Sequence, residues 1–204
     1  MNEHYFAEQP KSKLNFGIVR AYFRGRFFEF VTSSGVFSKT RIDPGTRLLI
    51  EEMVLPEKGW IFDVGCGYGP VGIAAATFNP SLHVVMADVN ERAVWLARKN
   101  IKRNSLENVE VWRGFLYEPV KNMKFETILS NPPIAAGMKT VFPLITQAPQ
   151  HLKEEGLLQI VVRSKVSGKR LTKLMEETFG NVTVLARKSG YRILGSKAIK
   201  HHSP

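Results

Sequence analysis

Residues 60–78 constrain the fold of this chain more than any other stretch. A short apolar segment at 60–64 runs into a loop with glycine at alternate positions, Asp63-Val-Gly65-Cys-Gly67-Tyr-Gly69, and an apolar, helix-like segment follows at 71–78. A buried strand, a glycine-rich turn and a helix in direct succession form a unit whose turn can approach a ligand closely. The sequence therefore predicts an α/β fold with a ligand site at this turn.

The alternation of strand-like and helix-like segments continues along the chain. Strands alternating with helices predict a mostly parallel sheet that is covered on both faces and binds its ligand beyond the carboxyl ends of the strands. A closing antiparallel hairpin is predicted around the turn Lys188-Ser-Gly190. The further strands are predicted at 83–87, 109–112, 127–130, 157–162, 182–186 and 191–194, and the further helices at 91–104, 140–152 and 168–179.

The first 58 residues are predicted to form a small lobe in front of a catalytic domain at 59–204, with both parts in one continuous structural unit. Segments 27–31 and 35–38 have strand-like composition and are separated by a turn-forming stretch. A helix is predicted at 46–54, with Asp43 or Thr46 as its N-cap.

The composition excludes several classes of protein. At 204 residues and 44% hydrophobic content, the chain can bury a sizeable core. Its single cysteine, Cys66, excludes an intrachain disulfide, and no apolar run approaches the roughly 20 residues of a membrane span. The N-terminus lacks a signal-peptide pattern, so a cytoplasmic enzyme is expected. No metal is expected, because metal-ligand spacing is missing among His4, His83, His151, His201 and His202.

The glycine loop is compatible with two cofactor classes. Read from Gly67, the segment Gly67-Tyr-Gly69-Pro-Val-Gly72 fits the dinucleotide fingerprint, and Asp88 follows near the expected distance. However, a carboxylate at Asp63 opposes a pyrophosphate and suits the ammonium and sulfonium of S-adenosylmethionine, which is the favoured cofactor. Asp88 is then expected at the ribose hydroxyls, with a helix cap as its alternative role.

The loop after the third strand of the sheet is expected to reach the adenine ring of this cofactor. Phe115 and Leu116 could enclose the ring, although ordinary core residues would look the same in the sequence. Cys66, inside the glycine loop, is interpreted as a small apolar residue rather than a nucleophile.

The tetrapeptide Asn131-Pro132-Pro133-Ile134 carries the chemistry. Two consecutive prolines fix two φ angles and restrict Asn131 before them, so they form a rigid turn. The side-chain oxygen of Asn131 and the carbonyl of Pro132 are expected to accept hydrogen bonds from a planar exocyclic amine. Such bonds localise the nitrogen lone pair, and alignment with the methyl donor then supplies much of the rate. Ile134 could stack on the base.

The net charge of +11 is concentrated in the last third of the chain. Residues 139–204 carry 12 basic and 4 acidic side chains, whereas residues 1–138 carry 17 and 14. A polyanionic partner such as RNA is predicted, with a merely solubilising basic face as the alternative.

Together these motifs resemble class I S-adenosylmethionine-dependent methyltransferases of the small-domain type, related to the bacterial 16S rRNA guanine-N2 methyltransferases. The chain is most similar to single-domain archaeal and bacterial members. The resemblance covers nearly the whole chain and rests on the glycine loop, the Asn131 turn, Gly35-Val-Phe-Ser38, Asp43-Pro-Gly-Thr-Arg-Leu-Leu49, Asp88-Val-Asn90 and Gly190-Tyr-Arg192. Two departures stand out: Phe115 occupies a position that is usually acidic, and the second domain with which larger bacterial relatives grip rRNA is missing.

The resemblance implies a doubly wound, seven-stranded, mostly parallel Rossmann-like sheet with an antiparallel C-terminal hairpin and a small N-terminal lobe that contains β-structure. It implies methylation of guanine N2 in rRNA by a monomer or homodimer, with Asn131, Pro132, Pro133 and Ile134 as catalytic residues. The cofactor-binding residues implied are Phe37, Asp63, Gly65, Cys66, Gly67, Gly69, Asp88, Val89, Phe115, Leu116 and Asn131.

Other acceptors remain open at this point. They are guanine N2 of tRNA, adenine N6 or cytosine N4 of RNA or DNA, a small molecule, and a protein amine. An RNA-binding assembly factor with a vestigial cofactor pocket is a further alternative.

Overall fold

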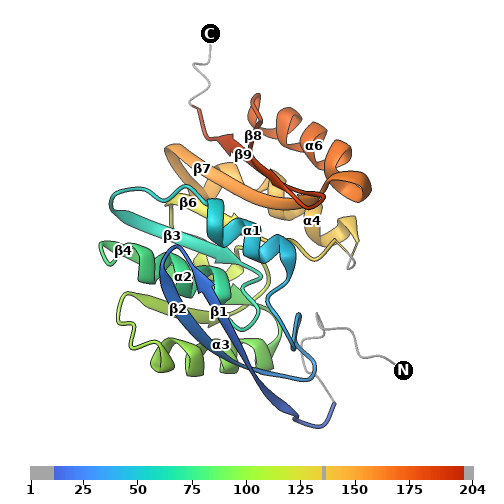
Figure 1. The fold of residues 1–204 in the computed structure, drawn as a ribbon. Coiled ribbons are helices and arrows are strands. Elements are labelled where there is room, and N and C mark those ends of the chain that lie inside the picture. Colours follow the sequence, from blue (N-terminus) through green and yellow to red (C-terminus); the bar gives the residue numbers. More distant parts are fainter. Residues whose placement is uncertain (1–11, 135–136, 200–204) are drawn as a thin grey trace.

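A seven-stranded sheet forms the centre of the molecule, with strand order β5-β4-β3-β6-β7-β9-β8. The computed structural model describes residues 12–134 and 137–199. Strands β3 to β7 pair in parallel, whereas β9 pairs antiparallel with both β7 and β8 (Figure 1). These strands are β3 (Gly59–Val64), β4 (Leu82–Asp88), β5 (Val109–Arg113), β6 (Phe125–Ser130), β7 (Leu152–Arg163), β8 (Thr183–Lys188) and β9 (Tyr191–Lys197).

Helices cover both faces of this sheet and divide the apolar core into two clusters. On one face lie α1 (Pro44–Glu52), α2 (Pro70–Phe78) and α3 (Glu91–Arg103). The other face carries η1 (Glu118–Val120), α4 (Met138–Thr146), α5 (Ala148–His151) and α6 (Lys169–Phe179). Alternate residues of β3 enter the two clusters, with Ile61 in the first and Phe62 in the second. The predicted α/β class and the antiparallel C-terminal hairpin are thus confirmed.

The N-terminal β-structure differs from the prediction. An antiparallel hairpin of β1 (Phe16–Phe23) and β2 (Arg26–Ser33) turns at Arg24 and Gly25, which have φ angles of 43° and 79°. Positive φ at both central residues matches the tight turns that hairpins prefer. The predicted strand at 35–38 is wrong, because the partner of β2 precedes it in the chain and residues 35–38 form turns.

The hairpin packs against the helices of the first face. It lies across α2 and α3 (Figure 1), with Phe23, Phe28 and Phe30 fully buried. The buried amide of Asn100 on α3 joins the two parts: its Oδ1 accepts from the N–H of Val31 at 2.7 Å, and its Nδ2 donates to the carbonyls of Val31 and Tyr68. Hairpin and sheet therefore share one core.

Several predicted boundaries in the C-terminal half shift. The single helix expected at 140–152 is two helices, α4 and α5, with Pro149 in the first turn of α5. Strand β7 starts five residues earlier than the predicted residue 157, across an irregularity in its pairing with β6. A π-helical turn, η3 (Ser164–Gly168), precedes α6.

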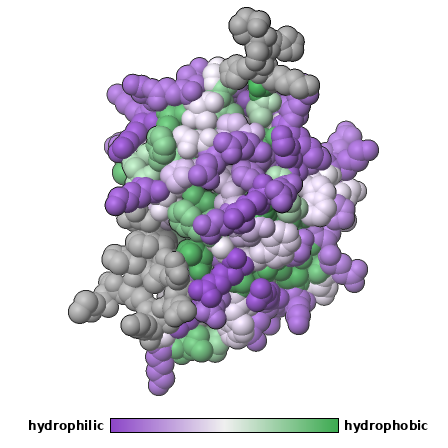
Figure 2. All heavy atoms as spheres, turned by 180° about the vertical axis from the view of Figure 1, so that it is seen from behind, coloured by the Kyte–Doolittle hydropathy of each residue, from purple (hydrophilic) through white to green (hydrophobic). Residues whose placement is uncertain are grey.

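The face of the molecule seen from behind is predominantly hydrophilic (Figure 2). Seen from behind, polar side chains project around the molecule and divide the apolar surface into smaller areas (Figure 2). None of the helices in the described part of the chain combines the length and the apolar character that crossing a membrane would require.

Candidate active site

The backbone N–H groups of the glycine loop donate hydrogen bonds to other parts of the protein and not to the cavity. The N–H groups of Gly65 and Cys66 both donate to the carbonyl of Ala87, at 2.9 and 3.0 Å. The N–H of Gly67 donates to Asp88 at 2.8 Å, and that of Gly72 donates to Asp63 at 2.9 Å. A pyrophosphate would need such N–H groups for itself, so the loop does not offer the cradle of a dinucleotide site.

A cavity opens above this loop, at the carboxyl ends of β3, β4, β5 and β6. Most of the predicted site residues line it, including Asp63, Asp88 and Asn131. The other predicted residues that line it are Phe37, Gly65, Cys66, Gly67, Val89, Phe115, Leu116, Pro132 and Pro133. The structure thus brings together loops that follow four different strands, as a parallel sheet requires.

Two carboxylates give one side of the cavity its electrostatic character. Burial raises the pKa of Asp63 to about 7, although the N–H of Gly72 lowers it, and the nearby charge of Asp88 raises it further. Burial likewise raises the pKa of Asp88, against the N–H groups of Asn90, Gly67 and Val89. A buried and a half-buried carboxylate, with no cation paired to either in the described part of the chain, favour a ligand that brings positive charge.

The Asn131 side chain is held in a single orientation. Its Nδ2 donates to Oδ2 of Asp43 at 3.0 Å and to Oγ1 of Thr46 at 2.9 Å. Because a carboxylate only accepts, the NH₂ group must face Asp43, and the amide oxygen is the part left for the cavity. No described residue donates to that oxygen.

Asp43 has two functions in this arrangement. Its Oδ2 accepts from the N–H groups of Gly45 and Thr46 at 2.9 and 3.1 Å, which makes it the N-cap of α1 as predicted. The same oxygen accepts from Asn131. The contacts of Asn131 with Asp43 and Thr46 were not predicted, although the cap pattern and the resemblance at 43–49 both marked these positions in the sequence.

The proline turn after Asn131 is closed by a short backbone bond. The N–H of Ile134 donates to the carbonyl of Pro132 at 2.8 Å, which leaves one lone pair of that carbonyl. The hydroxyl of Ser130 anchors the start of the turn by donating to the carbonyl of Val64 at 2.8 Å. The turn is therefore tied to the end of β3, where the glycine loop begins.

Residues 34–38, which follow the hairpin, contribute one wall of the cavity. Asn90 donates to the carbonyl of Gly35 at 2.9 Å, and Arg92 donates to that of Ser34 at 2.7 Å. The hydroxyl of Tyr68 donates to the carbonyl of Ser38 at 3.3 Å. These bonds place Phe37, which is 37% exposed, at the cavity wall.

Two predicted site residues do not line the cavity within the described part of the chain, namely Gly69 and Ile134. Gly69 is the N-cap of α2 at a φ of 95°, where an added Cβ would lie 3.0 Å from Ile73. Ile134 packs partly buried against the second core cluster.

Cys66 is disfavoured as a nucleophile by its surroundings. Burial, with the charges of Asp88 and Asp63, raises the pKa of the Cys66 thiol well above its usual range, which disfavours the nucleophilic thiolate. The described residues contain no group of side chains that could hold a metal ion. Three histidines of the sequence, His4, His201 and His202, lie outside the described residues.

Comparison with known proteins adds independent information. The family model "Methyltransferase small domain" matches residues 28–195. The "Uncharacterized protein YbxB" of Bacillus subtilis is 40% identical over 98% of this chain and all of that protein. The "Ribosomal RNA small subunit methyltransferase C" of Photorhabdus laumondii is 34% identical over 79% of this chain. The chain spans 48% of that protein, about half its length.

Solved structures agree on the fold. The Thermus thermophilus 16S rRNA N2 G1207 methyltransferase (RsmC), solved in complex with AdoMet and guanosine, superimposes with a TM-score of 0.81 at 24% identity. That match covers 92% of this chain and 52% of the Thermus chain.

Proposed function

The chain belongs to the methyltransferase small domain family and uses S-adenosylmethionine, and on this premise we propose that it methylates an exocyclic base amine, guanine N2 of rRNA. The fixed amide of Asn131 carries the proposal, because it presents an acceptor oxygen to the cavity. The relatives named as rRNA small-subunit methyltransferases and the basic last third of the chain support RNA as the acceptor.

The residues of the cavity fit the cofactor. Asp63 offers a buried carboxylate and Asp88 a half-buried one to a ligand that carries an ammonium and a sulfonium, and the glycine loop, whose N–H groups are already used, offers no phosphate site. When bound, S-adenosylmethionine supplies an electrophilic methyl group. Asp63 would face the amino acid part of the cofactor and Asp88 its ribose, with Phe37, Phe115 and Leu116 around the adenine.

Asn131 would act on the acceptor amine. Its amide oxygen and the remaining lone pair of the Pro132 carbonyl accept the two amine hydrogens, which localises the nitrogen lone pair. Asp43 and Thr46 hold the amide so that this oxygen needs no reorientation when the base arrives. The amine proton leaves after transfer, so no strong base is required at the site.

Labelled methyl transfer tests this function. The purified protein is incubated with S-adenosylmethionine carrying a labelled methyl and with total RNA, and the RNA is digested to nucleosides for mass spectrometry. The expected product is labelled N2-methylguanosine, found in the small-subunit rRNA fraction.

Each other outcome excludes part of the proposal. Label on adenosine or cytidine would keep the amine chemistry and overturn the base. Label in tRNA alone would overturn the substrate class. No labelled nucleoside from a protein that binds S-adenosylhomocysteine would exclude RNA methylation and lead to DNA, protein and small-molecule acceptors.

A further inference from the structure

An arginine stands at the acceptor side of the cavity, on the strand next to Asn131. Strand β7 is the parallel neighbour of β6, and their last register pair joins Ser130 to Ile160. β7 then continues three residues further, to Arg163. Parallel neighbours lie about 4.8 Å apart, so this extension runs beside the turn that begins at Asn131.

The Arg163 side chain is held by Tyr191, its register partner on β9. Its Nε donates to the Tyr191 hydroxyl at 3.0 Å, and its guanidinium carbon lies 5.5 Å from the ring centroid. This bond leaves the two terminal NH₂ groups of the guanidinium directed to solvent. The hydrogen bond to Tyr191 is also the main cause that raises the pKa of Arg163.

Tyr191 in turn is connected to the amine site. A Cβ on Gly45 would lie 3.1 Å from the Tyr191 ring, so the ring packs directly on the first turn of α1. The N–H of Gly45 donates to Asp43, which orients Asn131. Arg163 is thereby fixed relative to the acceptor oxygen through a short chain of contacts.

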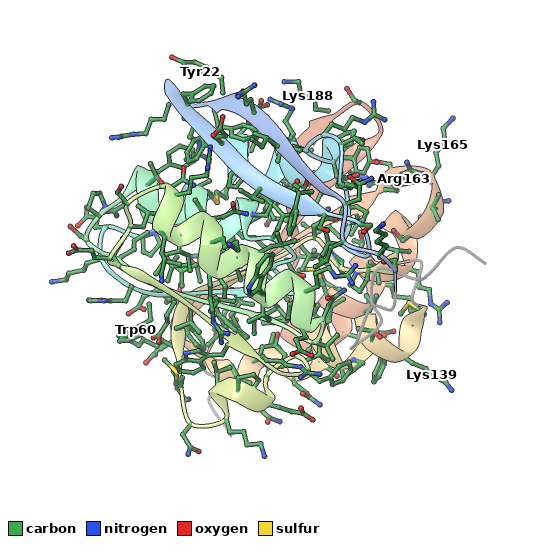
Figure 3. The ribbon with its side chains drawn as sticks, turned by 90° about the horizontal axis from the view of Figure 1, so that it is seen from below. Tyr22, Trp60, Lys139, Arg163, Lys165 and Lys188 are labelled. Atoms are coloured by element: carbon green, nitrogen blue, oxygen red, sulfur yellow. The ribbon has the colours of Figure 1, made fainter. Side chains whose placement is uncertain are left out.

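The cations on this side are without a close carboxylate in the described part of the chain, although the charge of Asp43 reaches Arg163 over a longer distance. Within the described residues, no carboxylate lies within ion-pairing distance of Arg163, Lys165 or Lys139. By contrast, Arg113 at the end of β5 pairs with Glu91, and Lys188 pairs with Glu51. Figure 3 shows Arg163 and Lys165 near each other and Lys139 farther along the same side of the molecule, with Trp60 on the other side.

We infer that Arg163, positioned by Tyr191 and flanked by Lys165, binds a backbone phosphate of the RNA next to the nucleotide that is methylated. The guanidinium fork matches the oxygens of a phosphate, and its fixed Nε reduces the conformational entropy lost on binding. This inference rests on the proposed RNA acceptor. It assigns to Arg163 a role in holding the acceptor, separate from the chemistry at Asn131.

The test compares four full-length proteins: wild type, Arg163→Gln, Tyr191→Phe and Lys124→Gln. Lys124 is an exposed cation just before the start of β6, at the end of the strand opposite the cavity. It serves as the charge-matched control. Affinity for a 16S rRNA transcript is measured with S-adenosylhomocysteine present, between about 50 and 200 mM salt. KM and kcat are measured on the same transcript with labelled cofactor.

Arg163→Gln is expected to raise Kd and KM for the RNA about tenfold, because a charge-assisted phosphate contact is lost. The slope of log K against log salt should become shallower by about 0.7 to 0.9. Tyr191→Phe keeps the charge and should raise KM by a smaller factor without changing the slope. In both variants kcat is expected to stay within about twofold of wild type, as loss of uniform binding predicts.

Two results would overturn the assignment: an Arg163→Gln protein whose affinity and slope match those of Lys124→Gln, or one that loses kcat with KM unchanged. The wild-type reaction separates this inference from the proposed function. If wild type labels no RNA, the RNA methyltransferase proposal fails, while the salt slope with S-adenosylhomocysteine still decides whether Arg163 contacts phosphate.

Discussion

At the residue scale, Asp43 is the side chain on which the orientation of Asn131 depends. Asp43→Ala removes the acceptor of two N–H groups of α1 and one of the two acceptors of the Asn131 amide, leaving Thr46 as the other. We expect kcat to fall about 10- to 100-fold, since a misplaced catalytic group costs rate without blocking binding. The lost cap should also lower the free energy of unfolding by about 1 kcal/mol.

Asp43→Asn is the matched control for this prediction. One oxygen of Asp43 accepts all three bonds, and the amide oxygen of an asparagine can replace it. This variant should therefore retain most of kcat. Steady-state kinetics measure kcat of both variants, and calorimetry measures their affinity for the cofactor. An equal loss of kcat in Asp43→Ala and Asp43→Asn would contradict a positioning role that depends on this oxygen.

The raised pKa of Asp63 predicts that cofactor binding depends on pH. Its pKa is raised from 3.8 to about 7 by burial, so near pH 6 the carboxyl is largely protonated and near pH 8 largely ionised. The ammonium group of S-adenosylhomocysteine requires the ionised carboxylate as its partner, and the affinity for this ligand should rise about tenfold over this range. Calorimetric titration measures it, and in Asp63→Asn the rise should disappear while affinity stays low.

The raised pKa of Asp63 also makes stability depend on pH. The stability of the ligand-free protein falls as pH rises, whereas the affinity for the cofactor rises. Between the unfolded pKa of 3.8 and the folded pKa of about 7, the folded protein holds the proton more tightly. The ligand-free protein therefore loses stability as pH rises through this window, by up to about 4 kcal/mol for this group alone. Thermal unfolding at pH 5 and pH 8 should show a larger loss in wild type than in Asp63→Asn, where only the raised pKa of Asp88 still contributes.

Several site residues were predictable from their place in the sequence. Asp63, Asp88 and Asn131 follow or end apolar strands, and parallel strands bring their carboxyl ends to one edge. The bond between Asn131 and Asp43 joins residues 88 apart in the chain, and no local pattern specifies such a pair. The presence of the site could thus be predicted from the sequence. The hydrogen bond from Asn131 to Asp43, which orients the Asn131 side chain, could not.

At the scale of elements, α2 can approach β4 closely because residue 72 is glycine. An added Cβ there would collide with the buried Met86 side chain and lie 3.2 Å from the Asp63 carboxylate. Gly72→Ala should therefore destabilise the protein by about 1 to 3 kcal/mol, although alanine normally favours a helix. Denaturant midpoints measure the effect, and adding Met86→Ala should reduce the penalty of the first change. A stabilised single variant would refute the close approach.

The elements that were mispredicted share a physical cause. The strand expected at 35–38 has suitable residues, but β2 already has its partner in β1, across the tight turn at Arg24 and Gly25. Tertiary pairing decides between two such candidates, and strand propensity alone does not. The π-helical turn η3 is likewise stabilised from a distance, by Arg192 donating to the hydroxyl of Ser164 at 3.0 Å.

At the scale of the whole molecule, the hairpin and the sheet should unfold as one unit. A chain shortened to residues 34–204 would expose the apolar surfaces of α2 and α3 that Phe23, Phe28 and Phe30 cover. It would also leave the buried amide of Asn100 without Val31. We expect such a chain to show no cooperative thermal transition by calorimetry, whereas the full chain shows one.

The result would also test the prediction that the N-terminal lobe and the catalytic domain form one continuous structural unit. A cooperative transition and unchanged cofactor affinity in the shortened chain would identify the hairpin as an appendage. The layered α/β architecture was predictable because the alternation of strands and helices is a local pattern. The packing of the hairpin over α2 and α3 was not, because it depends on complementary apolar surfaces that form only in the folded state.

The position of β9 has a consequence for protein synthesis. β9 pairs with both β7 and β8, yet the ribosome makes it after both of them. Until it emerges, β7 presents an unpaired edge, and Tyr191 is not yet available to hold Arg163. A nascent chain therefore cannot complete the proposed phosphate contact before translation has passed β9, and products that terminate earlier would lack the side chain that holds Arg163 in place.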